Sequence, residues 1–164
     1  MKINHNGMTE KQINITFQEF RTVEEMIPED RELANEAIAA MSCAYAPYSH
    51  FHVGAAVRMS NGQIVRGSNQ ENAAFPSGLC AERTALFAAG ARYPDKDARS
   101  IAIAGGVYGR LGIEPCTPCG ACRQVMAQYQ TKAGKPMSVI MIGSSRIWKF
   151  EKVDDILPLI FDSI

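Results

Sequence analysis

The segment VGAAVRMSNGQIVRGSN, residues 53–69, contains the clearest local signal for the fold. Residues 53–59 form a mostly apolar run that predicts a strand, and residues 63–69 predict the strand that returns beside it. Asn61-Gly62 lies between them and is typical of a tight hairpin turn, because both residue types adopt positive φ angles readily. The segment therefore predicts an antiparallel pair of strands.

Helical and strand patterns alternate along the rest of the chain. Acidic residues after Pro28 favour a helix start, and apolar residues then recur at helical spacing over residues 29–44. The further predicted elements are helices over 80–91 and 119–130, strands over 100–105, 136–142 and 147–150, and a short helix or turn over 153–158. This alternation indicates an α/β fold, in which helices cover both faces of one sheet.

The chain length of 164 residues suffices for one compact domain with a sizeable core and is too short for two such domains. Residues 1–28 are the least typical part. Loose alternation of Ile13, Ile15 and Phe17 within residues 12–20 indicates a strand or an extended arm. We therefore expect an N-terminal extension, residues 1–28, followed by a single domain, residues 29–164.

The charge balance argues against a polyanionic partner. Seventeen basic residues balance seventeen acidic ones, so no long-range field attracts nucleic acid or an anionic membrane. No apolar run approaches the ~20 residues of a membrane helix, and the polar N-terminus lacks the apolar stretch of a secretory signal. We expect a cytoplasmic protein without nucleic-acid or membrane partners, which binds a small molecule or further copies of itself.

Four of the five cysteines lie at two places in the sequence. Cys80 opens one predicted helix, and the next predicted helix is preceded and opened by Cys116, Cys119 and Cys122. In a reducing cytoplasm, clustered cysteines favour metal binding or catalysis over disulfides. A Cys-x-x-Cys pair at a helix start can hold one metal ion, and the positive helix end favours thiolates. A third sulfur from the other helix leaves one zinc position open for a catalytic water.

Spacing alone leaves several interpretations of this cluster open. Cys116/Cys119 and Cys119/Cys122 are overlapping pairs, and spacing does not separate them. All four sulfurs together would form a closed, structural zinc site. A redox pair is a further alternative.

Glu82 favours the catalytic interpretation. On a regular helix, positions 80 and 82 point about 200° apart, so the carboxylate reaches a metal site only if Cys80 caps the helix. A ligand, one residue, Glu and then Pro-Cys-x-x-Cys form the signature of zinc deaminases, in which the Glu transfers protons. Pro118 completes this pattern, selects Cys119 and Cys122 as ligands, and leaves Cys116 in the loop. Alone, Glu82 would be a solvated first-turn acid.

Four motifs follow one another along the chain: Tyr45-Ala46-Pro47-Tyr48-Ser49-His50-Phe51 with Val53-Gly54-Ala55-Ala56, Gly67 with Asn69-Gln70-Glu71-Asn72-Ala73, Cys80-Ala81-Glu82-Arg83-Thr84-Ala85, and Pro118-Cys119-Gly120-Ala121-Cys122-Arg123-Gln124. In this order they resemble the motifs of the small homotetrameric zinc-dependent cytidine deaminases, over roughly residues 30–161. The resemblance implies a three-layer α-β-α sandwich with a mixed five-stranded sheet and one Zn²⁺ per chain. It also implies hydrolytic deamination of cytidine and deoxycytidine to uridine and deoxyuridine, a reaction of pyrimidine salvage.

The resemblance also implies which residues bind the nucleoside. Asn69 and Glu71 would bond the ribose hydroxyls, Phe51 would pack on the nucleoside, and the Ala81 backbone would help to read the base edge. Without the motifs, Phe51 would be a core residue and the two polar residues would satisfy backbone groups in a loop.

Three further residues are implied at contacts between subunits of a homotetramer. Ala73 and Phe75 would reach toward a neighbouring pocket, and Phe161 would stack across the interface from the C-terminal segment. Phe161 could equally be a plain core or subunit contact.

The net charge of three thiolates around zinc needs an offset. Arg83 follows Glu82, and its N–H groups could bond the sulfurs and draw off negative charge. Zinc would lower the pKa of its water, and Glu82 would move protons from this water to N3 and to the departing amino group.

His50, His52 and Cys43 are predicted to have no role in the site. The two histidines are expected not to bind the metal, and Cys43 is expected to be a small buried apolar residue.

Other functions fit the residues less well. A deaminase of blasticidin S or of a deoxycytidylate is the nearest rival, but Asn69-Gln70-Glu71-Asn72 favours a free ribose and no basic cluster suits a 5′-phosphate. A polynucleotide editor does not fit the neutral charge. A zinc-stabilised binding module would need no proton shuttle at Glu82.

Overall fold

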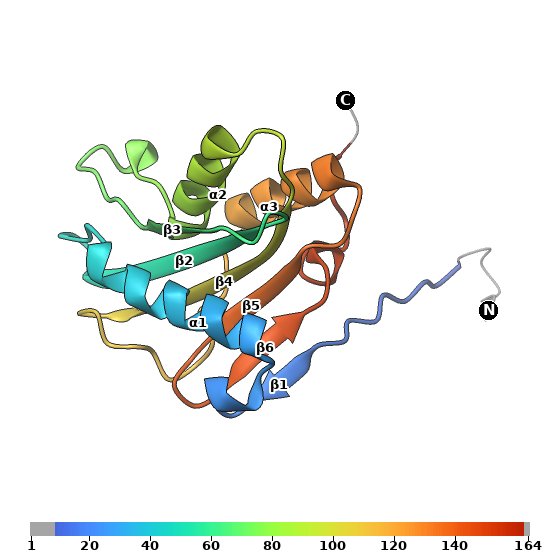
Figure 1. Cartoon of the computed structure of the whole chain (residues 1–164), viewed down its shortest axis with the longest axis horizontal. Coiled ribbons are helices and arrows are strands. Elements are labelled where there is room, and N and C mark those ends of the chain that lie inside the picture. Colours follow the sequence, from blue (N-terminus) through green and yellow to red (C-terminus); the bar gives the residue numbers. More distant parts are fainter. Residues whose placement is uncertain (1–8, 163–164) are drawn as a thin grey trace.

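The computed structural model describes residues 9–162, which form a single mixed sheet with helices on both faces (Figure 1). The strands are β1 (Gln18–Phe20), β2 (Phe51–Met59), β3 (Ile64–Ser68), β4 (Ala98–Val107), β5 (Ser138–Ile142) and β6 (Ile147–Phe150). The α-helices are α1 (Pro28–Ala40), α2 (Ala81–Arg92) and α3 (Gly120–Ala133). Short 3₁₀ helices cover Val23–Glu25, Met41–Cys43, Phe75–Ser77 and Val153–Asp155.

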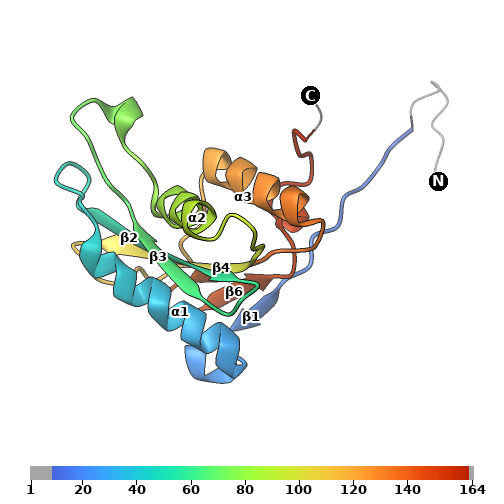
Figure 2. The ribbon, with the colours of Figure 1, turned by 45° about the horizontal axis from the view of Figure 1, so that its top comes forward.

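The strand order is β1-β6-β5-β4-β2-β3, and the neighbours β4 and β5 are parallel while the other pairs are antiparallel. Helix α1 covers one face, and α2 and α3 lie side by side on the other (Figure 2). Each face buries its own apolar cluster against the sheet. The predicted three-layer α-β-α sandwich is confirmed.

The predicted number of five strands is wrong, because β1 adds a sixth. Residues Gln18 to Phe20 pair antiparallel with Lys149 to Ile147 of β6. Phe17 packs on the rings of Trp148 and Phe150, with centroids 5.4 and 5.1 Å away. The Trp148 Nε1 donates a 2.7 Å hydrogen bond to Glu19. The N-terminal arm, which we define as residues 9–20, thus covers the outer edge of β6.

The predicted extension of residues 1–28 is only partly visible, because residues 1–8 lie outside the described part of the chain. Residues 18–20 form the strand that the alternating pattern allowed. The division into an extension and a domain at residue 28 stays a prediction.

Two close approaches explain why helices lie so near the β2–β3 hairpin. A Cβ atom at Gly67 would clash with the backbone of Ala81 and Ala85 in α2. A Cβ atom at Gly54 would clash with the backbone of Ala37 and Met41 around the end of α1. Glycine at these positions lets the first turn of α2 rest directly on the sheet, and this turn carries part of the candidate site.

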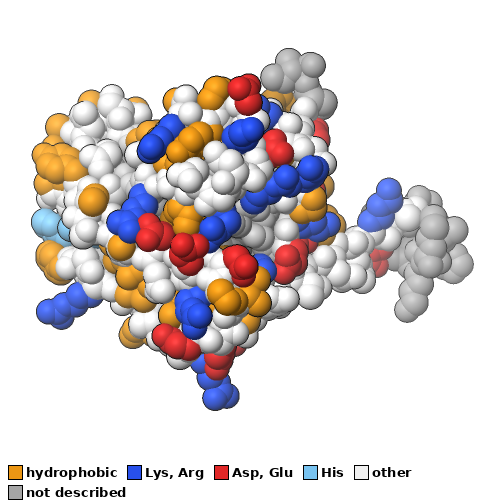
Figure 3. Space-filling view, viewed as in Figure 1, with side chains coloured by type: hydrophobic (Ala, Val, Ile, Leu, Met, Phe, Trp, Pro, Cys, Tyr) orange, Lys and Arg blue, Asp and Glu red, His pale blue; other side chains and the backbone are white. Residues whose placement is uncertain are grey.

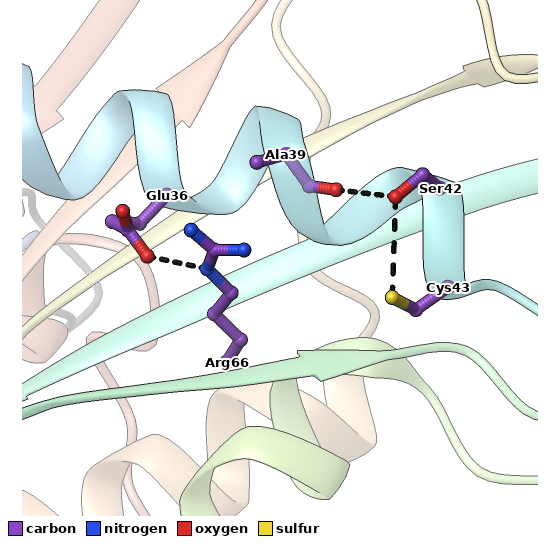
Figure 4. A network of polar contacts seen from close by, with 5 residues as sticks. All are labelled: Glu36, Ala39, Ser42, Cys43 and Arg66. Atoms are coloured by element: carbon purple, nitrogen blue, oxygen red, sulfur yellow. Dashed lines mark hydrogen bonds and ion pairs between the residues drawn. The ribbon is translucent and has the colours of Figure 1, made fainter.

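Polar contacts also hold α1 on β3 (Figure 4). Arg66 of β3 forms an ion pair with Glu36 of α1. Beyond the end of α1, the Ser42 hydroxyl donates to the carbonyl oxygen of Ala39 and lies 3.9 Å from the Cys43 sulfur. Cys43 is exposed, so its prediction as a buried apolar residue is wrong: the helical spacing ends at Ala40, and the following 3₁₀ turn rotates the side chain to the surface.

None of the helices in residues 9–162 combines the length and the apolar composition that a membrane crossing requires.

Candidate active site

Two helix N-termini bring the three predicted zinc ligands together. Cys80 is the N-cap of α2 and Cys119 is the N-cap of α3, each with extended backbone, while Cys122 lies in the first turn of α3. The three sulfur atoms all lie within 4.8 Å of one another. The Cys80 and Cys119 sulfurs are 4.0 Å apart. Residues 39 positions apart in the sequence therefore form one cluster of sulfur donors.

The donor set fits one zinc ion. A tetrahedral site with Zn–S bonds of about 2.3 Å places its sulfurs about 3.8 Å apart, close to the separation found here. Three sulfurs leave the fourth position of such an ion open. The cluster could therefore hold a zinc ion with room for one further ligand.

The charges of the thiols also favour a cation at this point. The pKa of Cys80 falls to about 5, mainly through its hydrogen bond with the Cys122 thiol and also through Arg83. The same contact and burial raise the pKa of Cys122. A Cys80 thiolate thus opposes the ionisation of Cys122, and a cation between them would favour the charged form of both.

Cys116 does not belong to this cluster, which consists of Cys80, Cys119 and Cys122. It packs against the core on the α2 and α3 side of the sheet. Burial, and secondarily the charge of Glu82, raise its pKa to about 12. The position of its sulfur outside the group of three therefore excludes Cys116 from the metal site.

Arg83 lies beside the cysteines as predicted. Its Nη2 atom donates to the Cys80 sulfur over 3.5 Å, and this bond raises the pKa of the guanidinium. Its buried Nε has no hydrogen-bond partner among the described residues. The side chain is placed to draw negative charge from the sulfur cluster.

Glu82 is buried in the first turn of α2, with 5% of its surface exposed. Burial raises the pKa of its carboxyl, and the charge of Cys80 adds to this effect. Because Cys80 caps the helix with extended backbone, Glu82 can face the cluster as the sequence required. A carboxyl whose pKa is shifted toward neutrality can both accept and donate a proton.

A cavity of about 520 Å³ opens beside the sulfur cluster and is lined by Cys80 and Arg83 at that end. Asn69 and Glu71, which the resemblance implies as ribose contacts, also line it. Phe75 lines it too, although the resemblance implies that this residue reaches toward a neighbouring subunit's pocket. Ala81, the first residue of α2, is buried and follows Cys80 directly in the chain. A cavity of this size suits a small organic ligand.

Asn69 and Glu71, the two polar residues predicted to bind the ribose, already form hydrogen bonds within the chain. Asn69 accepts from the Val53 N–H and donates to the Phe51 carbonyl oxygen, each over 2.8 Å. Glu71 accepts from the N–H groups of Tyr48 and Ser49 over 2.9 and 3.2 Å. Tyr48 and Ser49 line the cavity too. Neither Tyr48 nor Ser49 is among the predicted site residues, although both lie within the first of the four motifs.

The other predicted binding residues are not among those that line the cavity. Phe51 is 40% exposed at the start of β2, and Ala73 is exposed in the loop before α2. Phe161 is 68% exposed, and its carbonyl oxygen accepts a 2.7 Å hydrogen bond from Gln124 of α3. Phe75 lines the cavity and is 73% exposed. Of these four residues, one chain therefore places only Phe75 at the cavity.

The family profile described as the cytidine and deoxycytidylate deaminase zinc-binding region matches residues 27–135. The chain belongs to this family. The match includes both helix starts, so the sulfur cluster lies within the zinc-binding region of this deaminase family.

Individual relatives agree with this deaminase assignment. A cytidine deaminase of Halalkalibacterium halodurans is 48% identical over 102 residues, which span 60% of this chain and 71% of the relative. The crystal structure of a cytidine deaminase from Burkholderia pseudomallei matches with a TM-score of 0.67 at 39% identity, over 79% of this chain and 97% of that one. The cytidine deaminase structure from Mycobacterium tuberculosis matches with a TM-score of 0.65 at 28% identity, over 84% and 100%.

Proposed function

We propose that this chain is a cytidine deaminase that hydrolyses cytidine and deoxycytidine to uridine and deoxyuridine, the reaction of pyrimidine salvage. One observation carries the proposal: a buried carboxyl with a raised pKa lies next to a three-sulfur metal site at the end of a cavity. A zinc-stabilised binding module needs neither the carboxyl nor the open fourth position. The relatives with matching sequence are themselves named cytidine deaminases.

Cys80, Cys119 and Cys122 would hold the zinc ion. When bound there, zinc lowers the pKa of a water molecule and makes it a nucleophile at neutral pH. Glu82 would accept a proton from the attacking water as the oxygen adds to C4 of cytosine, and would deliver that proton to N3. Glu82 would then take the remaining proton from the C4 hydroxyl and pass it to the amino group, so that the C4–N bond breaks and ammonia leaves. Cytidine and water thus give uridine and ammonia.

Arg83 supports this chemistry from beside Cys80. Its guanidinium offsets part of the negative charge of three thiolates, which would otherwise weaken the metal as a Lewis acid. The N-termini of α2 and α3 act in the same direction, because each presents its positive end to the sulfurs.

The sugar would lie in the part of the cavity lined by Asn69 and Glu71. Glu71 retains lone pairs for ribose hydroxyls beyond its bonds to residues 48–49. Phe51 would pack against the nucleoside, and the N–H of Ala81, which has no acceptor within its helix, would bond the base edge.

A free nucleoside suits this site better than a nucleotide or a polynucleotide. Glu71 places a negative charge in the cavity, where a phosphate would be repelled, and Arg83 is its one cationic lining residue among those described. The chain is neutral overall, and over the middle of the face shown in Figure 3 Lys and Arg side chains are interspersed with Asp and Glu. We infer that the protein acts in the cytoplasm on small molecules, with no nucleic-acid or membrane partner.

We infer further that the protein is a homotetramer whose pockets are shared between subunits. Exposed Ala73, Phe75 and Phe161 would contact neighbouring pockets, which would cover the apolar surface that one chain leaves open. Sedimentation analysis should give four times the mass of the chain, and a monomeric active enzyme would contradict the assembly.

A spectroscopic assay tests the activity. The zinc-loaded protein should convert cytidine and deoxycytidine, which is seen as a shift of the ultraviolet spectrum toward that of the uracil product. Deoxycytidylate serves as the comparison substrate. No turnover of either nucleoside, or turnover of deoxycytidylate alone, would refute the proposal.

A further inference from the structure

Ser49 occupies an unusual position between two groups proposed to contact the nucleoside. Its hydroxyl donates a hydrogen bond to the Glu71 carboxylate. The same oxygen accepts a 3.0 Å hydrogen bond from the N–H of Phe51. One side chain therefore connects the carboxylate that faces the sugar with the backbone of the aromatic residue.

The Glu71 carboxylate receives three hydrogen bonds from one short turn. The N–H groups of Tyr48 and Ser49 both bond Oε2, and the Ser49 hydroxyl bonds Oε1. These bonds fix both oxygens, and the hydroxyl contributes most to the lowered pKa of Glu71. A carboxylate held in this way is ionised at neutral pH and can direct its remaining lone pairs into the cavity.

The backbone is shaped to make this connection. His50, between Ser49 and Phe51, has a φ of 56°, a left-handed conformation that residues other than glycine rarely adopt. This turn brings the Phe51 N–H back onto the Ser49 hydroxyl. On the other side of Phe51, its carbonyl oxygen accepts from Asn69. Strain of this kind persists where surrounding contacts enforce it, and it is enriched at functional sites.

We propose that Ser49 is a positioning residue for the sugar: its hydroxyl holds the Glu71 carboxylate in the orientation that accepts hydrogen bonds from the ribose hydroxyls. This role rests on the proposed cytidine deaminase activity. It assigns to the first motif a function in reading the sugar, whereas the zinc-binding motifs act on the base.

The test compares cytidine with 2′,3′-dideoxycytidine, which lacks both hydroxyls, for the zinc-loaded protein. In Ser49→Ala we expect KM for cytidine to rise about tenfold with kcat within about twofold, because a hydrogen bond to a charged group is lost in ground and transition states alike. For dideoxycytidine, kcat/KM should change less than about twofold, since this substrate gives Glu71 nothing to bind.

Three further variants separate positioning from a structural role. Ser49→Thr keeps a hydroxyl and should restore most of the preference for cytidine. Ser49→Ala should have little additional effect in a Glu71→Gln background, because the two residues act as one unit. The control is Ser60→Ala, an exposed serine at the far end of β2 whose hydroxyl accepts from the Asp97 N–H over 3.2 Å, and it should leave both substrates unchanged.

The possible failures are distinguishable. If the wild-type protein converts neither nucleoside, the proposed deaminase function fails and the role of Ser49 fails with it. If the wild type is active and Ser49→Ala loses activity equally on both substrates, or on neither, then Ser49 does not position Glu71 for the sugar and the deaminase function stands.

Discussion

Glu82→Gln should retain one zinc ion per chain and lose nearly all turnover of cytidine. Gln keeps the size of the side chain but cannot accept and release a proton at neutral pH, so kcat should fall at least about 1,000-fold. The three sulfurs are unchanged, and a buried amide needs no ionisation. Metal analysis and the ultraviolet assay on the same sample measure both quantities.

Glu29→Gln provides the matched control for this prediction. Glu29 is also an acid in the first turn of a helix, α1, but it is exposed and lies outside the candidate site. It should therefore keep wild-type activity. Full activity of Glu82→Gln would exclude the proton-transfer mechanism, and loss of zinc from this variant would instead give Glu82 a role in the metal site.

Cys119→Ala should lose zinc, whereas Cys116→Ala should keep it. Removing one of three sulfurs from the cluster leaves too few protein ligands for a tight site, so zinc content should fall from about one per chain to near zero after dialysis. Cys116 lies outside the cluster, so its removal leaves the three sulfurs in place. Elemental analysis after dialysis against a weak chelator measures the difference.

Cys43→Ala controls for the removal of any thiol, since Cys43 is exposed and stands apart from the cluster. It should keep both zinc and activity. Zinc loss from Cys116→Ala together with zinc retention by Cys119→Ala would show that the wrong pair of cysteines has been chosen. Thermal unfolding of each variant separates zinc loss from loss of the fold.

Local patterns were sufficient to predict most of the fold and the chemical core of the site. The β2–β3 hairpin could be predicted from Asn61-Gly62 and the flanking apolar runs. The structure pairs the two strands antiparallel across this turn, as that pattern requires. The helices beginning beside Cys80 and Cys119 follow from composition and apolar spacing. The metal cluster could be predicted because two short motifs each place a sulfur at a helix start, where geometry and charge are set locally.

Features that depend on distant contacts were not predictable in the same way. Three residues of β1 form a strand only because the edge of β6, more than a hundred residues away, is available to pair. Cys43 is exposed because α1 ends before it. The hydrogen bond from the Ser49 hydroxyl to Glu71 joins residues that are 22 positions apart. The bond that this hydroxyl accepts from the Phe51 N–H accompanies a left-handed backbone at His50, which is uncommon for residues other than glycine.

The contact between the N-terminal arm and Trp148 gives this protein a built-in optical probe. Trp148 is the one tryptophan in the sequence, and its indole is in contact with Phe17 and bonded to Glu19. Tryptophan emission depends on the polarity around the indole ring. Intrinsic fluorescence therefore reports, without any label, whether the N-terminal arm lies on β6. This signal can be measured separately from the deaminase activity.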